Sequence, residues 1–127
     1  MGRPSLVTVV ARPLLAATFV NGGWRSLRDP AGLIGLARKA GVPAADVAVP
    51  ATSAAMVGGG VALSLGIAPV TSAATLTACL AGATYGVHGF WREQEPGPRA
   101  IHRAALLTNV AVAAGLLLVA ADARARG

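Results

Sequence analysis

The side chains that could take part in chemistry gather at the end of an apolar run, in the stretch YGVHGFW at residues 85–91. The chain has two histidines and two tryptophans, and one of each lies in this stretch. Thr84 and His88 are four residues apart, and His88 and Trp91 are three apart, so on a helix these side chains share one face. Because an imidazole can donate and accept hydrogen bonds, His88 is the first candidate for a binding residue.

Two asparagines in other apolar runs could meet this face. Asn109 lies about two turns, roughly 9–10 Å, inside the last run, and Asn21 lies less than a turn from the end of the first. Polar side chains inside a bilayer are costly and therefore mark candidate functional sites. The sequence predicts a small binding site for a polar headgroup or a quinone ring, formed by Asn21, Thr84, His88, Trp91 and Asn109. The alternative is that these groups bond only to one another and hold the helices in register.

A second polar pair belongs to the opposite ends of the same runs. Arg12 interrupts the first run, and Asp122, at the end of the last run, is the only acidic residue expected on that side of a membrane. A bidentate ion pair between them would tie the first helix to the last. The alternative is that Arg12 extends to the lipid headgroups.

The remaining residue types exclude several chemistries. The sequence has no Ser/His/Asp arrangement, no paired carboxylates within the apolar runs, no CxxC and no phosphate-binding glycine loop. Its one cysteine, Cys79, allows neither an internal disulfide nor a metal site. Haem ligation by His88 and His102 is a further alternative, but His102 falls outside the apolar runs. We therefore expect no catalytic residues, no metal and no resident cofactor, with a quinone or lipid as the candidate ligand.

The composition indicates that lipid surrounds the elements that carry these residues. Hydrophobic residues make up 54% of the 127 residues and charged residues only 13%, against about 25% in soluble domains. The net charge is +6, but the basic residues lie in short gaps between apolar runs. This placement is typical of membrane-flanking charge and not of a nucleic-acid-binding face.

Four apolar runs are each close to the ~20 residues that a helix needs to cross the hydrocarbon core. They are residues 5–23, 51–68, 70–88 and 104–121. The first could instead be a signal peptide, but Arg12 and Pro13 interrupt it and no cleavage site is evident. The sequence thus predicts an all-α polytopic membrane protein of one domain, 1–127, folded as an antiparallel bundle of four transmembrane helices.

The links between the runs predict further features. Pro50 should begin the second helix, and Ala68 with Pro69 leaves room only for a tight antiparallel hairpin between the second and third helices. Small residues four apart should allow close helix packing; they are Ala55, Gly58, Gly59, Ala62 and Gly66. Residues 30–40 read either as an interfacial amphipathic helix, capped by Asp29 and ended by Gly41, or as a surface loop.

The charge distribution predicts an orientation. Of the eleven Lys and Arg residues, seven lie in the two longer loops, three lie near the termini and Arg12 lies within the first run. The positive-inside rule then places the longer loops in the cytoplasm of a multi-pass plasma-membrane protein. Trp24 and Trp91 both fall at that boundary, as expected for interface anchors.

Four segments in order resemble the DoxX family of small membrane proteins, in particular its actinobacterial members. They are ARPLLAATFVNGGWRSLRDP at 11–30, GGVALSLG at 59–66, HGFWREQEPGPRA at 88–100 and TNVAVAAGLLLVAAD at 108–122. The sequence departs from the pattern at Met56, where some relatives carry glutamate, and at Thr108, where many carry lysine. The resemblance implies a four-helix integral membrane protein, and it implies an association with quinone-linked oxidation because the family takes its name from a subunit of that kind.

Two functions follow from these observations. The first is a non-catalytic accessory or scaffold subunit of a membrane oxidoreductase or respiratory assembly. The alternative is a binder or carrier of a small lipophilic molecule, either a quinone or a lipid. A stand-alone enzyme is less favoured than either. The expected partners are the lipid bilayer and other membrane subunits, and the small-residue faces also permit homo-oligomers.

Overall fold

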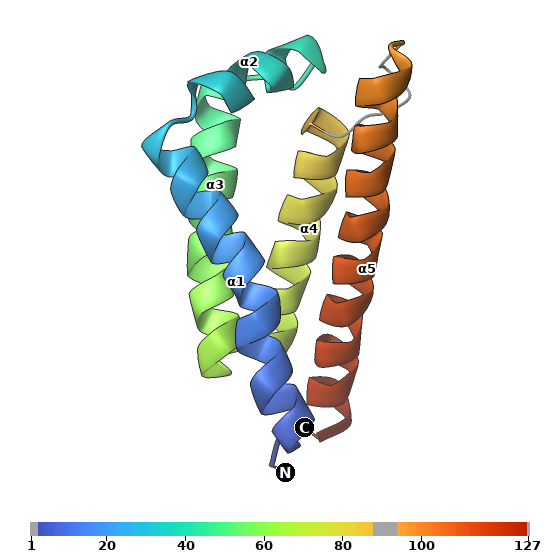
Figure 1. The fold of residues 1–127 in the computed structure, drawn as a ribbon. Helices are drawn as coiled ribbons and strands as arrows, with labels where there is room; N and C mark the ends of the chain where they lie inside the picture. Colours follow the sequence, from blue (N-terminus) through green and yellow to red (C-terminus); the bar gives the residue numbers. More distant parts are fainter. Residues whose placement is uncertain (1–2, 88–93, 127) are drawn as a thin grey trace.

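Four long helices lie side by side, and a fifth, short helix crosses one end of them (Figure 1). This computed structural model describes residues 3–87 and 94–126. Its helices are α1 (Leu6–Arg28), α2 (Ala31–Lys39), α3 (Ala45–Leu65), α4 (Pro69–Val87) and α5 (Pro96–Arg126). The four long helices alternate in direction, and both ends of the chain lie at the end opposite α2 (Figure 1). The predicted all-helical, antiparallel arrangement is confirmed.

Three of the long helices extend beyond the apolar runs. Helix α1 begins after Ser5, whose Oγ accepts a hydrogen bond from the backbone N–H of Thr8 at 3.2 Å, and it runs through Pro13 to Arg28. The prediction that the second long helix starts at Pro50 is wrong, because α3 begins at Ala45. Proline removes only one helical hydrogen bond, and Asp46 in the first turn complements the helix dipole.

Helix α5 begins at Pro96, eight residues before the apolar run. The extension is polar and includes Arg99 and Arg103, so apolarity alone gives no indication of it. Proline is favoured in a first helical turn, because its missing N–H would be unpaired there in any case. A proline-rich polar segment that reads as a loop can therefore begin a helix.

The turn between α3 and α4 is as short as expected. Gly66 has φ 72° and Ala68 has φ 42°, and the backbone N–H groups of Gly66 and Ile67 donate back to the carbonyls of Leu63 and Ala62 at 3.1 and 2.8 Å. This double closure of a helix end is the Schellman arrangement, which reverses the chain within a few residues. The predicted tight hairpin is confirmed.

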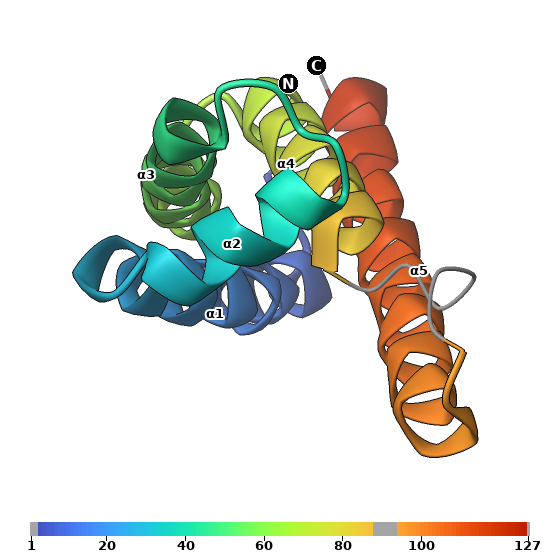
Figure 2. The same ribbon diagram turned by 90° about the horizontal axis from the view of Figure 1, so that it is seen from above.

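Residues 31–39 form a helix and not a loop. The prediction that Asp29 caps this helix is wrong: Asp29 ends α1, where its N–H donates to the Arg25 carbonyl at 3.1 Å, and Pro30 precedes α2. Gly41, at φ 84°, ends the helix as expected. Seen from the end of the bundle, α2 crosses the space between α1, α3 and α4 (Figure 2).

Small residues bring α1 and α3 close together. A Cβ on Gly60 would lie 2.7 Å from Val20 Cγ2, and one on Gly23 would lie 2.6 Å from the Ser53 carbonyl oxygen. Of the predicted small residues, Gly59 packs against Leu76 of α4, whereas a Cβ on Gly58 would meet nothing within 4 Å. The close contact between α1 and α3 therefore uses the face of α3 that carries Gly60. The predicted face, which carries Gly58 and the small residues four positions apart from it, is a different one.

The core is small and lies where all four long helices meet. Phe19, Leu63, Leu76 and Leu116, one from each long helix, are almost completely buried. Many large apolar side chains instead face outward, among them Leu14 and Leu118. Helices α1, α3 and α5 are each long and apolar enough to cross a membrane. The described part of α4 does not satisfy the same criteria of length and apolarity. Apolar side chains on the outer surface agree with a lipid environment.

Candidate functional site

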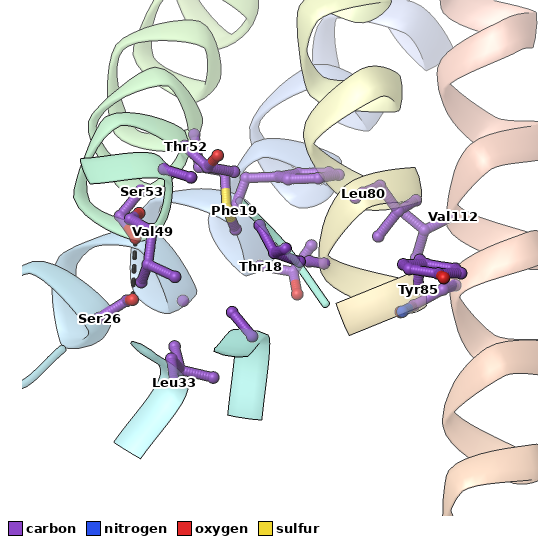
Figure 3. A pocket seen from close by; sticks show the side chains of 18 of the residues that line it. Thr18, Phe19, Ser26, Leu33, Val49, Thr52, Ser53, Leu80, Tyr85 and Val112 are labelled. Atoms are coloured by element: carbon purple, nitrogen blue, oxygen red, sulfur yellow. Dashed lines mark hydrogen bonds between the residues drawn. The ribbon is translucent and has the colours of Figure 1, made fainter. Parts of the chain in front are cut away.

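A cavity of about 470 Å³ lies at the end of the bundle that α2 covers (Figure 3). All five helices contribute to its wall: for example, Phe19 comes from α1, Leu33 from α2, Val49 from α3, Leu80 from α4 and Val112 from α5. Its volume falls within the roughly 300–1,000 Å³ of small-molecule sites. These side chains are apolar, so the cavity suits an apolar ligand body.

Two serines form one polar position on the wall. Ser53 Oγ lies 2.8 Å from Ser26 Oγ and 2.8 Å from the Val49 carbonyl oxygen (Figure 3). A hydroxyl has one proton, so when Ser53 donates to the carbonyl, Ser26 donates to Ser53. Both serines are buried, and the bond joins α1 to α3. The hydroxyls therefore hold these helices together and also present oxygen atoms to the cavity.

A second polar position lies across the cavity, between α4 and α5. Asn109 Nδ2 donates to Thr84 Oγ1 at 2.8 Å. Thr84 is buried, whereas Asn109 is half-buried and lines the cavity together with Tyr85. A primary amide has two N–H donors and a carbonyl acceptor, so Asn109 carries more hydrogen-bonding capacity than Thr84 uses. Asn109 is the best-placed polar group for a ligand.

The structure brings together only part of the predicted site. Thr84 and Asn109 are joined by a hydrogen bond, which agrees with the alternative that the polar groups bond to one another and hold the helices in register. Asn21 is exposed and does not line the cavity. His88 and Trp91 lie outside the described residues, so the part of the prediction that depends on them remains a prediction.

The sequence analysis did not identify several small and hydroxyl-bearing residues of the cavity wall. Thr18, Gly22 and Ser26 follow one another at intervals of four on α1, and all three line the cavity. Thr52 joins Ser53 on the facing side of α3. A spacing of small and hydroxyl residues at i, i+4, i+8 could have indicated a polar stripe, but Ser26 lies beyond the end of the apolar run.

The predicted Arg12–Asp122 pair takes another form. Asp122 Oδ2 accepts a hydrogen bond from Thr8 Oγ1 at 2.9 Å and pairs with Arg126 one turn further along α5. Arg12 is only 8% exposed, and a Cβ on Gly66 would lie 2.8 Å from its Nη1. Its guanidinium thus lies against the C-terminal end of α3, where the negative end of the helix dipole attracts a cation. Within the described residues α5 is tied to α1 through Thr8, and no direct Arg12–Asp122 ion pair is present.

The described wall residues supply a few hydrogen-bonding groups and much apolar surface. In the described part of the chain, no group of three or more His, Cys, Asp or Glu side chains is placed to hold a metal ion. Cys79 is buried, with its Sγ 3.9 Å from the Thr52 carbonyl oxygen. The described cavity wall offers hydroxyls, an amide and apolar side chains, a combination that binds a mostly apolar molecule through one or two hydrogen bonds.

Apolar membrane-spanning helices around a lipophilic cavity define a small helical integral membrane protein. Residues 7–89 match the DoxX family model, and the chain belongs to this family. The matched segment spans α1 to α4 and stops short of α5, so Asn109 lies outside it. Searches of curated proteins and of solved structures give no match.

Proposed function

We propose that the protein binds a small, neutral, lipophilic molecule, of the quinone or lipid class, in the cavity beneath α2. The observation that carries this proposal is an apolar cavity of about 470 Å³ with a half-buried amide, Asn109, on its wall. Apolar walls with a few well-placed polar groups are the usual construction of a small-molecule site. The Asn109 amide can hydrogen-bond a carbonyl or hydroxyl oxygen of such a ligand.

The neutrality of the ligand is supported by two wall positions. Met56 and Thr108 both line the cavity, and they stand where the family resemblance indicates glutamate or lysine in relatives. Burying a charged ligand group beside apolar side chains, without a countercharge, would be costly. A quinone ring or an uncharged lipid segment avoids this cost.

The proposal includes four membrane crossings. Helix α4 carries no Asp, Glu, Lys or Arg and packs between α3 and α5, so it shares their surroundings. Trp24, which is 56% exposed, lies near the α2 end with Arg25 and Arg28, as an interface anchor would. By the positive-inside rule, α2 and the α4–α5 link then face the cytoplasm of the plasma membrane. The orientation places the C-terminus outside the cytoplasm. A C-terminal fusion to a reporter that works only outside the cytoplasm should therefore be active. Activity of a reporter that works only in the cytoplasm would contradict this orientation.

Two variants of matched chemistry test the cavity. A Cβ on either Gly82 or Gly58 would meet no atom within 4 Å, so a side chain can begin in open space at both positions, but of the two only Gly82 lines the cavity. We expect Gly82→Leu to weaken binding of a short-chain ubiquinone analogue at least 10-fold, and Gly58→Leu to leave it unchanged. Asn109→Leu should weaken binding about 2- to 12-fold, the loss of one hydrogen bond. Titration of the detergent-solubilised protein measures all three, and equal affinity in the two glycine variants would refute the proposal.

The second candidate function is a non-catalytic accessory subunit of a membrane oxidoreductase or respiratory assembly. Membership of the DoxX family favours it, because the family name derives from such a subunit. Purification from the native membrane separates the two functions. If the protein purifies without partner proteins and with a lipophilic molecule bound, the cavity proposal is supported. If it co-purifies with a large redox complex and its cavity is empty, the cavity proposal is wrong and the accessory role is supported. The resemblance to actinobacterial members remains a prediction.

A further inference from the structure

The first and last long helices meet near the chain termini and diverge toward α2. Near the termini, Thr8 Oγ1 donates to Asp122 Oδ2 at 2.9 Å, and a Cβ on Gly115 would lie 2.9 Å from Leu15 Cδ2. Toward α2 the two helices separate, as both views of the ribbon show (Figure 1 and Figure 2). The line along which α1 and α5 face each other is called the α1–α5 seam below.

The residue spacing along the seam locates the point where the helices separate. Gly22 and Thr108 are the next facing positions, seven residues, or about two turns, beyond the second of these contacts. A Cβ on Gly22 would meet Met56 Cε of α3 at 3.6 Å and, among the described residues, no atom of α5 within 4 Å. The contact between α1 and α5 has therefore ended about 10 Å further along α1 than Leu15.

The cavity beneath α2 reaches the outside of the molecule where the two helices separate. It is partly open, and both sides of the seam contribute to its wall, with Thr18 and Gly22 from α1 and Thr108 and Val112 from α5. Thr18 and Thr108 are themselves exposed. Because α1 packs on α3, α3 on α4 and α4 on α5, and because α2 covers the end of the bundle, the opening lies in the α1–α5 seam. It faces the lipid expected around α1 and α5.

The size of the cavity limits how much of a ligand it can hold. A water molecule occupies about 30 Å³ in the liquid and a CH2 group is of similar size, so a cavity of about 470 Å³ holds roughly 15 non-hydrogen atoms. This is enough for a quinone ring or another compact head, but not for that head together with a long prenyl or acyl chain. A long chain must therefore leave the cavity, and an opening toward hydrocarbon keeps it out of water.

We propose that the cavity binds the head of a neutral amphiphile with a long hydrocarbon tail, and that the tail extends into the bilayer through the opening between α1 and α5. This inference rests on the proposed function and adds the form of the ligand and its route, which is sideways from the membrane. The head reaches the Asn109 amide on the cavity wall. At the rim, Thr108 Oγ1 donates to the Ala104 carbonyl oxygen at 3.0 Å, so this hydroxyl is already paired where the hydrocarbon tail passes.

A cross-link across the opening tests the route. The background is Cys79→Ala, which removes the chain's one cysteine. Thr18→Cys with Thr108→Cys then places a thiol on each side of the opening. As a control, Ala11→Cys with Leu118→Cys places thiols on the same two helices nearer the termini, outside the cavity wall. A bismaleimide joins each pair in the detergent-solubilised full chain, and stopped-flow quenching of tryptophan fluorescence gives the association and dissociation rates of the short-chain ubiquinone analogue.

We expect the cross-link between positions 18 and 108 to slow both rates at least about tenfold relative to the same variant without cross-linker, because an obstructed route changes rates more than Kd. The cross-link between positions 11 and 118 should change neither rate. Unchanged rates in the first variant, or equal slowing in both, would overturn the lateral route while the proposed function stands. If the variants without cross-linker and the wild type bind no analogue, the proposed function fails and this inference fails with it.

The position of the tail is tested separately. A ubiquinone analogue that carries a diazirine at the end of a decyl tail is bound to the wild-type chain and photoactivated, and mass spectrometry locates the labelled peptides. The label should lie on α1 and α5, which border the opening. Label confined to α2, α3 or α4 would overturn the proposal, because the tail would then lie inside the cavity or leave it by another side.

Discussion

Replacement of Gly23 by alanine tests whether the α1–α3 contact depends on the missing side chain. A Cβ at this position would lie 2.6 Å from the Ser53 carbonyl oxygen, 3.0 Å from Val57 Cγ2 and 3.1 Å from Met56 Cβ. The carbonyl oxygen and the Cβ atom are fixed to the α3 backbone, so neither can rotate away. Restoring an ordinary contact of 3.4 Å from 2.6 Å requires the two helices to separate locally by about 0.8 Å.

The expected cost combines three effects. Overpacking a close contact costs about 1–3 kcal/mol. Separation of the helices also stretches the 2.8 Å bond between Ser53 and Ser26, which is worth about 1 kcal/mol. The higher helix propensity of alanine than of glycine opposes this loss and stabilises the folded state by about 1 kcal/mol. We therefore expect Gly23→Ala to lower the free energy of unfolding by about 1–3 kcal/mol.

Thermal unfolding in detergent, followed by tryptophan fluorescence, measures this loss. Gly58→Ala is the matched control, because a Cβ there meets nothing within 4 Å and alanine should leave Tm unchanged or slightly raised. Gly23→Ala should unfold several degrees below that control. If the two variants unfold at the same temperature, the close contact between α1 and α3 does not depend on Gly23 and the reasoning fails.

Three further predictions concern other contacts. Gly60→Ala should destabilise the fold by about 1–3 kcal/mol, and Val20→Ala should restore much of this loss in the double variant, because a Cβ on Gly60 would lie 2.7 Å from Val20 Cγ2; additive losses would contradict this. Thr8→Val should lower Tm by removing the hydrogen bond to the Asp122 carboxylate, while Thr8→Ser should retain the wild-type Tm; equal Tm values for the two would refute a role for the hydroxyl. Cys79 should react with a maleimide only after unfolding, since it is buried; rapid labelling of the folded protein would show that α3 and α4 do not pack as described.

The elements of the fold could be predicted where a local signal exists. The apolar runs indicated the long helices, the Ala68–Pro69 link indicated the hairpin, and Gly41 indicated the end of α2. The start of α3 at Ala45 and the polar extension of α5 before residue 104 were missed. Both begin in segments whose composition resembles a loop, and a helix there depends on packing and on tolerated prolines more than on apolarity.

The candidate site could be predicted only in part for a similar reason. Thr84 and Asn109 stood out because each is a polar residue in an apolar run, and they are in contact. Asn21 has the same signal but faces outward, because helix rotation about its own axis is set by the neighbouring helices. Ser26 and Ser53 gave no distinct signal, yet the α1–α3 approach at Gly23 brings them within a hydrogen bond.

Amino-acid composition and spacing alone are enough to predict a helical membrane protein, because the cost of exposing polar backbone to lipid leaves few other structures. The partners of Arg12 and Asp122 depend on the tertiary structure. Sequence reasoning paired the only opposite charges expected on one side, but three-dimensional packing directs Arg12 to the end of α3 and places Thr8 and Arg126 against Asp122. Charge specifies that each group must find a partner, whereas the rotation and crossing of the helices decide which partner lies within reach.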